Sequence, residues 1–298
     1  MLQFMKKIQK GVKMPPAIVR DDRKTVEISK EEQDSERIPV QERTEEEEQA
    51  GIRAAYATHI GTRQYQQDSL YLSDNKDGFM YAVLCDGMGG MDEGDKVSAD
   101  VVAWFVRCLE KLPPETDIPQ FFVREIRRVN DFVLEEYGKR AVLAGTTFTC
   151  VVIRKNHLYW ASVGDSRIYI IRGNEIVQMT RDHNYAMKLE QMVQDGSLTR
   201  EEAEKNPQKE ALISYIGAPF IEIMDVSKGP FSLQEGDVVL SCSDGLTKSL
   251  GDEDILQIVK MYGGSIQKAA HMLTSLAFDT GDGEKDNTSV ILIRYPFQ

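Results

Sequence analysis

Residues 146–179 read TTFTCVVIRKNHLYWASVGDSRIYIIRGNEIVQM, and this stretch decides the class of fold. Runs of β-branched and aromatic residues alternate in it with short polar or glycine-containing links, a pattern typical of strands joined by tight turns. The pattern predicts strands over 146–153, 158–163, 167–171 and 176–179, with turns at 154–156, 164–166 and 172–174. A long run of strands without an intervening helix argues against a doubly wound parallel sheet.

Further strand-like and helical segments flank this stretch. Apolar strand-like runs lie at 54–59, 70–72, 79–85, 238–241 and 289–293, and helical periodicity marks 94–111, 118–136, 252–261 and 265–278. Residues 184–216 are polar and helical, with breaks at Gly196 and Pro207, and have the character of a mobile lid. The order predicts an α+β domain with antiparallel sheets and helices outside them.

The composition excludes several classes of function. With 298 residues, of which 41% are hydrophobic, the chain is long enough for one large or two small domains with a sizeable core. A net charge of −12 argues against nucleic-acid binding, because phosphate contacts need a basic face. The sequence contains no run long and apolar enough for a membrane span and no secretory apolar segment, so we expect a cytoplasmic protein.

Residues 1–50 differ from the rest of the chain. Residues 1–20 carry five basic residues and no acidic ones, whereas residues 21–48 carry twelve acidic and five basic ones. Apolar residues are sparse after Val19, so we expect a disordered or loosely ordered charged extension. The alternative is a docking arm, or a basic anchor on a membrane surface within residues 1–14.

The four cysteines do not form a recognisable metal or disulfide pattern. Cys85, Cys108, Cys150 and Cys242 include no C-x-x-C pair, and no histidine lies at metal-ligand spacing from them. Cys85 and Cys242 end strand-like runs, so we expect small buried core residues in a reducing compartment.

Three aspartates, in contrast, stand beside strand-like runs and next to glycine or asparagine. Asp86 follows 79–85, Asp244 follows 238–241, and Asp286 precedes 289–293. A strand fixes a carboxylate, and a neighbouring glycine lets backbone and water approach a hard cation. Carboxylate, carbonyl and water oxygens suit Mg²⁺ or Mn²⁺, and carboxylates from distant strands suggest a two-metal site. A single Asp-Gly is more often an ordinary turn.

Seven motifs in order now identify a family resemblance. They are R-x-x-x-Q-D (63–68), D-G-M-G-G (86–90), G-T-T (145–147), V-G-D-S-R (163–167), D-H (182–183), S-D-G-L (243–246) and D-N-T (286–288). This set resembles the metal-dependent serine/threonine protein phosphatases of type 2C in their bacterial form. The resemblance covers about residues 53–295. It implies an α-β-β-α sandwich of two antiparallel sheets flanked by helices, with a metal cleft at one edge. The phosphatase domain would span residues 51–298 and carry 184–216 as a helical flap insertion.

The resemblance also implies metal ligands. Asp86 would bridge two Mn²⁺ or Mg²⁺ ions, the carbonyl of Gly87 would be a ligand of one of them, and Asp244 and Asp286 would hold the other. Asp68 would lie beside the site and hydrogen-bond water on the metal.

The implied activity is hydrolysis of phosphoserine and phosphothreonine in proteins by direct attack of a metal-bridging water. Arg63 would contact the substrate phosphate, because a guanidinium can pair two phosphate oxygens. Phosphorylated proteins would be the partners, with a serine/threonine kinase or its targets among them, and we expect a monomer. Two other classes stay open: a pseudophosphatase that binds phosphoproteins without turnover, and a different two-metal hydrolase such as a nuclease.

The chain departs from the family pattern at several positions. Met88 stands where many relatives have a histidine that is proposed as a general acid, and methionine cannot donate a proton. Residues 141–144 contain no carboxylate where many relatives have an aspartate for a third ion, so a third ion is in doubt. Gln67 replaces a glutamate, a change that bacterial-type sequences tolerate.

The remaining motifs favour structural roles. Asp165 and Arg167 are expected to pair within the V-G-D-S-R turn. His183 is expected to cap or pack rather than to donate a proton. Thr199 and Glu202 match a helix-capping box.

Overall fold

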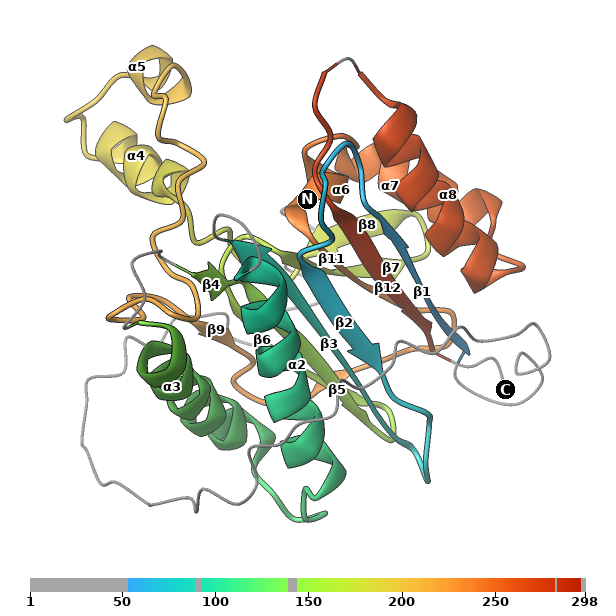
Figure 1. Ribbon diagram of the computed structural model, residues 1–298. Helices are drawn as coiled ribbons and strands as arrows, with labels where there is room; N and C mark the ends of the chain where they lie inside the picture. Colours follow the sequence, from blue (N-terminus) through green and yellow to red (C-terminus); the bar gives the residue numbers. More distant parts are fainter. Residues whose placement is uncertain (1–52, 89–92, 139–143, 282, 296–298) are drawn as a thin grey trace.

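The computed structural model describes residues 53–88, 93–138, 144–281 and 283–295 (Figure 1). The predicted extension at 1–50 lies outside these residues. Among the helices of the described part, none combines the length and the apolar character that a membrane crossing requires.

Two antiparallel sheets form the centre of the molecule (Figure 1). The first sheet has the strand order β1-β12-β11-β7-β8, and the second has the order β10-β6-β5-β3-β2, with β4 paired to β3 and β9 paired to β6. The strands of the first sheet are β1 (Arg53–His59), β7 (Arg167–Arg172), β8 (Glu175–Gln178), β11 (Val238–Cys242) and β12 (Thr288–Arg294). Those of the second are β2 (Asp68–Leu72), β3 (Phe79–Met88), β4 (Gly145–Thr146), β5 (Phe148–Arg154), β6 (His157–Val163), β9 (Asp225–Val226) and β10 (Phe231–Ser232).

Helices cover the outer face of each sheet (Figure 1). Helices α2 (Gly94–Glu110) and α3 (Ile118–Tyr137) pack on the second sheet, and α7 (Asp252–Met261) and α8 (Ile266–Asp279) pack on the first. A third buried cluster lies between the sheets and includes Leu84, Trp160, Ile170 and Val239. Each sheet therefore buries both faces, which is why its strands are nearly continuously apolar. The predicted α-β-β-α sandwich is confirmed.

The sequence prediction missed short elements, and its helical assignment of 184–216 is wrong for residues 205–216, which contain no helix. The strands β4, β9 and β10 have two residues each, and α6 (Asp244–Thr247) is a single turn. Their pairing is set by tertiary contacts, since a two-residue strand has no periodicity to detect. Cys85, Cys150 and Cys242 are buried free thiols, and the expected core role of Cys85 and Cys242 is confirmed.

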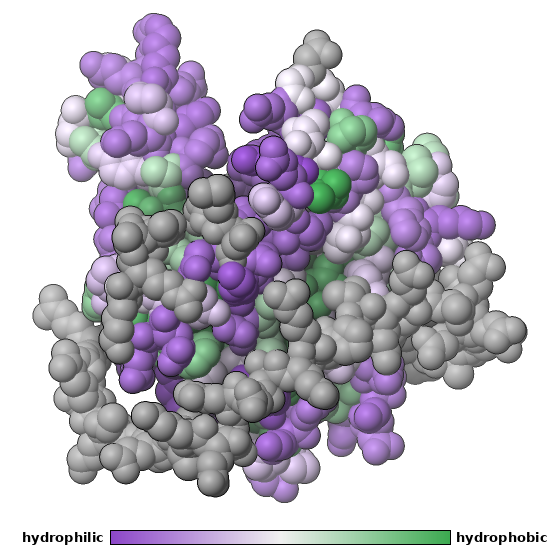
Figure 2. Space-filling view, viewed as in Figure 1, coloured by the Kyte–Doolittle hydropathy of each residue, from purple (hydrophilic) through white to green (hydrophobic). Residues whose placement is uncertain are grey.

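The insertion forms a flap that stands away from the sandwich (Figure 1). It carries α4 (Tyr185–Gln194) and α5 (Arg200–Glu204), and the predicted capping box between Thr199 and Glu202 at the start of α5 is confirmed. Its surface is mostly hydrophilic, and a hollow separates it from the rest of the molecule (Figure 2).

The expected pair of Asp165 and Arg167 is wrong. Arg167 instead makes a two-pronged contact with Asp182, with Nε–Oδ1 and Nη2–Oδ2 distances of 2.8 and 2.6 Å. The β7–β8 hairpin brings Asp182 alongside Arg167, whereas Asp165 lines a cavity at the end of the sheets.

Asp225 joins the two chain segments that enter and leave the flap. Its carboxylate accepts hydrogen bonds from the backbone N–H (2.8 Å) and Nε (3.0 Å) of Arg181, and lies 3.5 Å from Nε2 of His183. His183 is fully buried, and its Nδ1 accepts a hydrogen bond from the backbone of Gly164, which confirms a packing role. Burial opposes the charge on Asp225, but His183 and Arg181 outweigh burial and hold the pKa of Asp225 well below its ordinary value.

We predict that Asp225→Asn lowers the free energy of unfolding by about 2 kcal/mol at pH 7, because it breaks a largely buried ion pair. The folded-state pKa is depressed, so this stabilisation is present above the unfolded pKa of about 4 and is lost as the pH falls further. Urea unfolding at pH 7 and at pH 3 measures the difference. Glu201→Gln, which removes an exposed ion pair with Lys205, serves as the control and changes stability by less than about 0.5 kcal/mol. An equal loss for Asp225→Asn at both pH values would contradict the prediction.

Candidate functional site

The predicted acidic residues meet at one end of the two sheets. Asp68 at the start of β2 is the register partner of Asp86 near the end of β3, so both lie at the same edge of the second sheet. Asp244 follows β11 and Asp286 precedes β12, and these strands are neighbours in the first sheet. The packing of the two sheets thus brings together carboxylates that are far apart in the sequence.

A cavity of about 580 Å³ opens between these residues and the flap. From the sandwich it is lined by Arg63, Gln67, Asp86, Gly87, Met88, Ala144, Gly145, Thr147, Asp165, Asp244 and Asp286, and from the flap region by Glu210, Leu212 and Tyr215. Four of its lining residues are the expected ligands Asp86, Gly87, Asp244 and Asp286. Asp68 is not in the lining and lies behind it.

Asp68 and Asp86 are buried carboxylates. Oδ2 of Asp68 accepts a hydrogen bond of 2.8 Å from Ser243, while its Oδ1 is buried and has no hydrogen-bond partner. Burial, with added repulsion from Asp244 and Asp286, raises the pKa of Asp68 to about 7. Burial and the charge of Asp68 also raise the pKa of Asp86 well above its ordinary value.

The polypeptide around Asp86 is held by the G-T-T motif. The carbonyl oxygen of Asp86 accepts hydrogen bonds from the backbone of Thr147 (2.9 Å) and the hydroxyl of Thr146 (2.9 Å), and its N–H donates to the hydroxyl of Thr147 (2.9 Å). The next residue, Gly87, is so close to Gly94 that a Cβ atom would lie 2.1 Å from the carbonyl oxygen of Gly94. This motif therefore positions the carboxylate as well as beginning a core strand.

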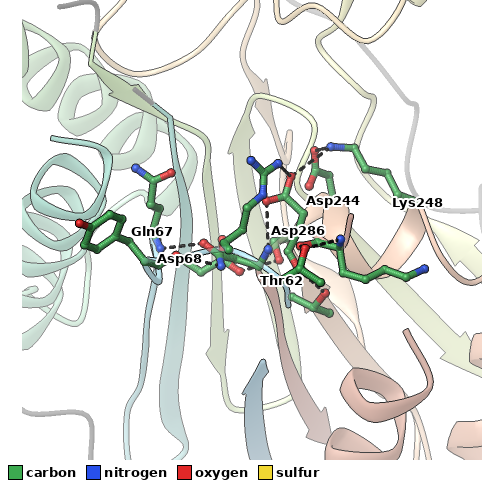
Figure 3. A network of polar contacts seen from close by, with 12 residues as sticks. Thr62, Gln67, Asp68, Asp244, Lys248 and Asp286 are labelled. Carbon is green, nitrogen blue, oxygen red and sulfur yellow. Dashed lines mark hydrogen bonds and ion pairs between the residues drawn. The ribbon is translucent and has the colours of Figure 1, made fainter. Parts of the chain in front are cut away.

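Two basic side chains contact the carboxylates on the other sheet (Figure 3). Nη2 of Arg63 donates to Oδ2 of Asp286 at 3.1 Å, and the ammonium of Lys248 pairs with Oδ2 of Asp244 and lies 3.6 Å from Oδ2 of Asp286. Burial raises the pKa of Asp244, and Lys248 reduces that rise. Burial works against the Lys248 ammonium, but Asp244 and Asp286 outweigh it and hold the pKa of Lys248 above its usual value.

The donor set fits hard divalent cations. Oδ1 of Asp68 and Oδ1 of Asp244 are buried acceptors without a hydrogen-bond partner, and buried carboxylates normally pair with a cation or a donor. Within the described residues, no three acidic, histidine or cysteine side chains already converge in metal-ligand geometry. Asp244 and Asp286 instead each turn one oxygen toward a basic side chain, Oδ2 of Asp244 toward Lys248 and Oδ2 of Asp286 toward Arg63.

Three residues at the site have roles that sequence reasoning missed. Asp165 lines the cavity, and burial together with Asp244 raises its pKa to about 7. Lys248 was not singled out, although it follows the S-D-G-L motif at helical spacing from Asp244. Asn287 belongs to the D-N-T motif but had no assigned function.

Asn287 holds the loop that carries Arg63 through three hydrogen bonds to its backbone. Thr62 and Gln67 of this loop are labelled in Figure 3. Its Oδ1 accepts from the backbone N–H of Gln67 (2.8 Å), and its Nδ2 donates to the carbonyl oxygens of Ile60 (2.8 Å) and Tyr65 (3.1 Å). Asn287 is only 4% exposed, so its amide group has little access to water as an alternative partner. Asn287 therefore fixes Arg63 relative to the adjacent Asp286.

The positions tied to a third ion and to leaving-group protonation are only partly described. Met88 lines the cavity, as does Ala144, and neither carries a group that binds a cation or gives up a proton at neutral pH. Residues 141–143 lie outside the described part of the chain.

Comparisons with known proteins agree with this geometry. The family model described as Protein phosphatase 2C matches residues 57–277. The chain therefore belongs to the protein phosphatase 2C family.

Individual relatives are bacterial. The chain is 29% identical over 250 residues to the serine/threonine phosphatase stp of Listeria welshimeri, which covers 81% of this chain and 95% of that protein. The structure of the S. agalactiae serine/threonine phosphatase superposes with a TM-score of 0.71 at 30% identity, covering 82% of this chain and 99% of the other. The catalytic domain of PstP in complex with two manganese ions gives a TM-score of 0.66 at 27% identity, with 83% and 99% coverage.

We predict that Asn287→Ala lowers the free energy of unfolding by about 3 kcal/mol, because it removes three hydrogen bonds between a buried side chain and partly buried backbone groups. Urea unfolding measures this loss. Asn156→Ala, in the exposed turn between β5 and β6, is the matched control and is expected to change stability by less than about 0.5 kcal/mol. Equal stabilities for Asn287→Ala and the wild type would show that the three bonds do not hold the loop.

Proposed function

We propose that this chain is a metal-dependent phosphatase that hydrolyses phosphoserine and phosphothreonine in proteins. The observation that carries the proposal is the meeting of Asp86, Asp244, Asp286 and Arg63 around one cavity in a chain of the protein phosphatase 2C family. The names of the relatives, which are serine/threonine phosphatases, favour this reading over a pseudophosphatase or a nuclease.

Asp86, the carbonyl of Gly87, Asp244 and Asp286 are the residues that would hold two Mn²⁺ or Mg²⁺ ions. Bound ions supply positive charge to an otherwise acidic cavity and activate water as a nucleophile at neutral pH. The PstP structure with two manganese ions supports this stoichiometry. Ala144, the described residue before the G-T-T motif, has no carboxylate, and we assign no third ion to the other acidic residues of the lining, Asp165 and Glu210.

Arg63 is the group of this chain that would bind the phosphate. Its side chain is 52% exposed and reaches Asp286 through one nitrogen, so its remaining donors face the cavity opening or solvent. A guanidinium offers paired donors that match two phosphate oxygens. The bond to Asp286 aims it at the phosphate, and the hydrogen bonds of Asn287 limit the movement of its loop.

Asp68 would orient the attacking water from behind the cavity. The hydroxyl of Ser243 fixes its Oδ2, and Ser243 is itself held by the backbone N–H of Ser289 at 2.9 Å. This leaves Oδ1 of Asp68 as a fixed acceptor beside Asp86. Met88 cannot protonate the leaving alkoxide, so the proton comes from water or from another residue.

The flap would contact the polypeptide on either side of the phosphorylated residue. Glu210, Leu212 and Tyr215 line the same cavity as the carboxylates, and the hollow beside the flap is wide enough to be seen on the surface (Figure 2). Phosphorylated proteins are therefore the proposed substrates, among them a kinase or its targets. A monomeric state and a cytoplasmic location stay predictions.

The primary test is metal-dependent turnover of a phosphothreonine peptide. We predict that the wild-type chain with Mn²⁺ releases phosphate, that excess EDTA abolishes release, and that Asp244→Asn lowers kcat/KM by roughly a hundredfold or more because it removes a metal ligand. Asp279→Asn, an exposed aspartate at the end of α8, is the matched control and keeps the wild-type rate. Mn²⁺ binding without turnover in the wild type would instead identify a non-hydrolytic phosphoprotein binder.

A second test addresses Arg63. We predict that Arg63→Ala lowers kcat/KM by roughly ten- to a hundredfold, mainly through KM, because it removes a phosphate contact made in both ground and transition states. Arg63→Lys restores part of the charge but not the paired geometry, and gives an intermediate value. Steady-state kinetics at saturating Mn²⁺ separates this effect from metal loss. An unchanged KM in Arg63→Ala would remove Arg63 from the phosphate site.

A further inference from the structure

Lys248 lies between Asp244 and Asp286, two carboxylates that the family resemblance implies as ligands of the same metal ion. Its ammonium pairs with Oδ2 of Asp244 and lies 3.6 Å from Oδ2 of Asp286 (Figure 3). Arg63, by comparison, contacts Asp286 only, through a single 3.1 Å bond. A single cationic side chain of the protein thus contacts or approaches one oxygen of each of these two carboxylates.

The local sequence builds this contact into the chain. Lys248 follows α6 directly, and its backbone N–H donates to the carbonyl oxygen of Asp244 at 2.8 Å, which closes one helical turn. Residues four apart on a helix face the same side, so an aspartate and a lysine at this spacing meet without any other element. The Lys248 side chain is 48% exposed, so its end can swing into water without repacking the core.

We propose that Lys248 is a built-in competitor of the divalent cations at Asp244 and Asp286 and thereby sets the metal affinity of the site. The proposal rests on the ligand assignment in the proposed function. An ammonium has only donors and cannot itself ligate a metal. A metal that binds through Oδ2 of Asp244 or Asp286 therefore has to displace Lys248, and a metal that binds through the unpartnered Oδ1 of Asp244 is still repelled by the nearby ammonium. Both effects lower affinity.

This arrangement also explains how the partly buried carboxylates of Asp244 and Asp286 can lie close together at the cavity. Asp244 is 16% exposed, and Asp286 is 31% exposed, so neither charge is fully solvated. Lys248 supplies a compensating charge in the protein itself, and the folded chain does not depend on a metal ion to balance Asp244 and Asp286. A site of this kind fills only when free divalent cation is plentiful.

Calorimetric titration of the full chain with Mn²⁺ tests the proposal. Lys248→Gln, which removes the charge and leaves a polar side chain one atom shorter, is expected to bind Mn²⁺ roughly 3- to 30-fold more tightly than the wild type. Lys248→Arg keeps the charge and is expected to stay within about threefold of the wild type. Lys205→Gln is the control. It removes an ion pair with Glu201 that has the same four-residue spacing but lies on the flap, and it is expected to leave Mn²⁺ affinity unchanged.

Unchanged or weaker Mn²⁺ binding by a folded Lys248→Gln variant would overturn the proposal. Thermal melting establishes whether the variant folds. If the variant does not fold, amine labelling of the wild-type protein, read by peptide mass spectrometry, provides the test. Labelling of Lys248 is expected to become several-fold faster in saturating Mn²⁺, and labelling of Lys205 is expected to stay unchanged. Equal Lys248 labelling with and without Mn²⁺ would also overturn the proposal.

The outcome is separable from that of the proposed function. Tighter Mn²⁺ binding by Lys248→Gln in a chain that releases no phosphate would support the role of Lys248 and reject the phosphatase. Normal phosphate release with identical Mn²⁺ affinities would support the phosphatase and reject the role of Lys248.

Discussion

Carboxylates that are held close together with little access to water repel one another, and the rest of the cavity is organised around that repulsion. Asp68 and Asp86 are neighbours across the β2–β3 pair, and burial raises the pKa of both. In water such charges would separate, but here the backbone prevents it. On the neighbouring sheet, Lys248 and Arg63 offset the charges of Asp244 and Asp286, and the bound divalent ions that we propose would offset the remaining negative charge. A chain that moved these carboxylates apart would reduce their repulsion, and it would also weaken the attraction of the cavity for a metal ion.

The two-sheet architecture is what keeps these charges in place. Asp68 and Asp86 belong to one sheet, Asp244 and Asp286 flank strands of the other, and a cluster of large apolar side chains between the sheets fixes their separation. The register of β2 on β3 is equally important, because a slip of one residue would turn Asp68 to the opposite face. Buried alternate residues on β2, such as Leu70 and Leu72, specify that register through their packing. The core therefore determines the electrostatics of the cavity.

The sequence predicted the layers well, and it also predicted that distant acidic residues meet at one place, because both features leave local signals. Apolar strands and amphipathic helices have a period, and the acidic residues stand at strand ends next to glycine or asparagine. Contacts between distant segments leave no such signal. Asn287 accepts a hydrogen bond from the backbone N–H of Gln67, a residue 220 positions earlier. Every residue type except proline has this N–H, so the identity of residue 67 does not indicate the contact. The pairing of Arg167 with Asp182 rather than Asp165 likewise depends on where the β7–β8 hairpin returns.

Thr146 joins the flap to Asp86, the proposed metal ligand. Its backbone exchanges hydrogen bonds of 2.9 Å with Ile216 at the end of the flap segment, and its hydroxyl donates to the carbonyl oxygen of Asp86. The base of the flap is therefore part of the same hydrogen-bonded structure as Asp86. The tip, with α4 and α5, has exposed ion pairs and few buried side chains. Sequence changes at the tip can alter the surface offered to a phosphoprotein while leaving Asp86 where it is, whereas changes at residues 145–147 or 214–217 act on substrate contacts and metal ligands together.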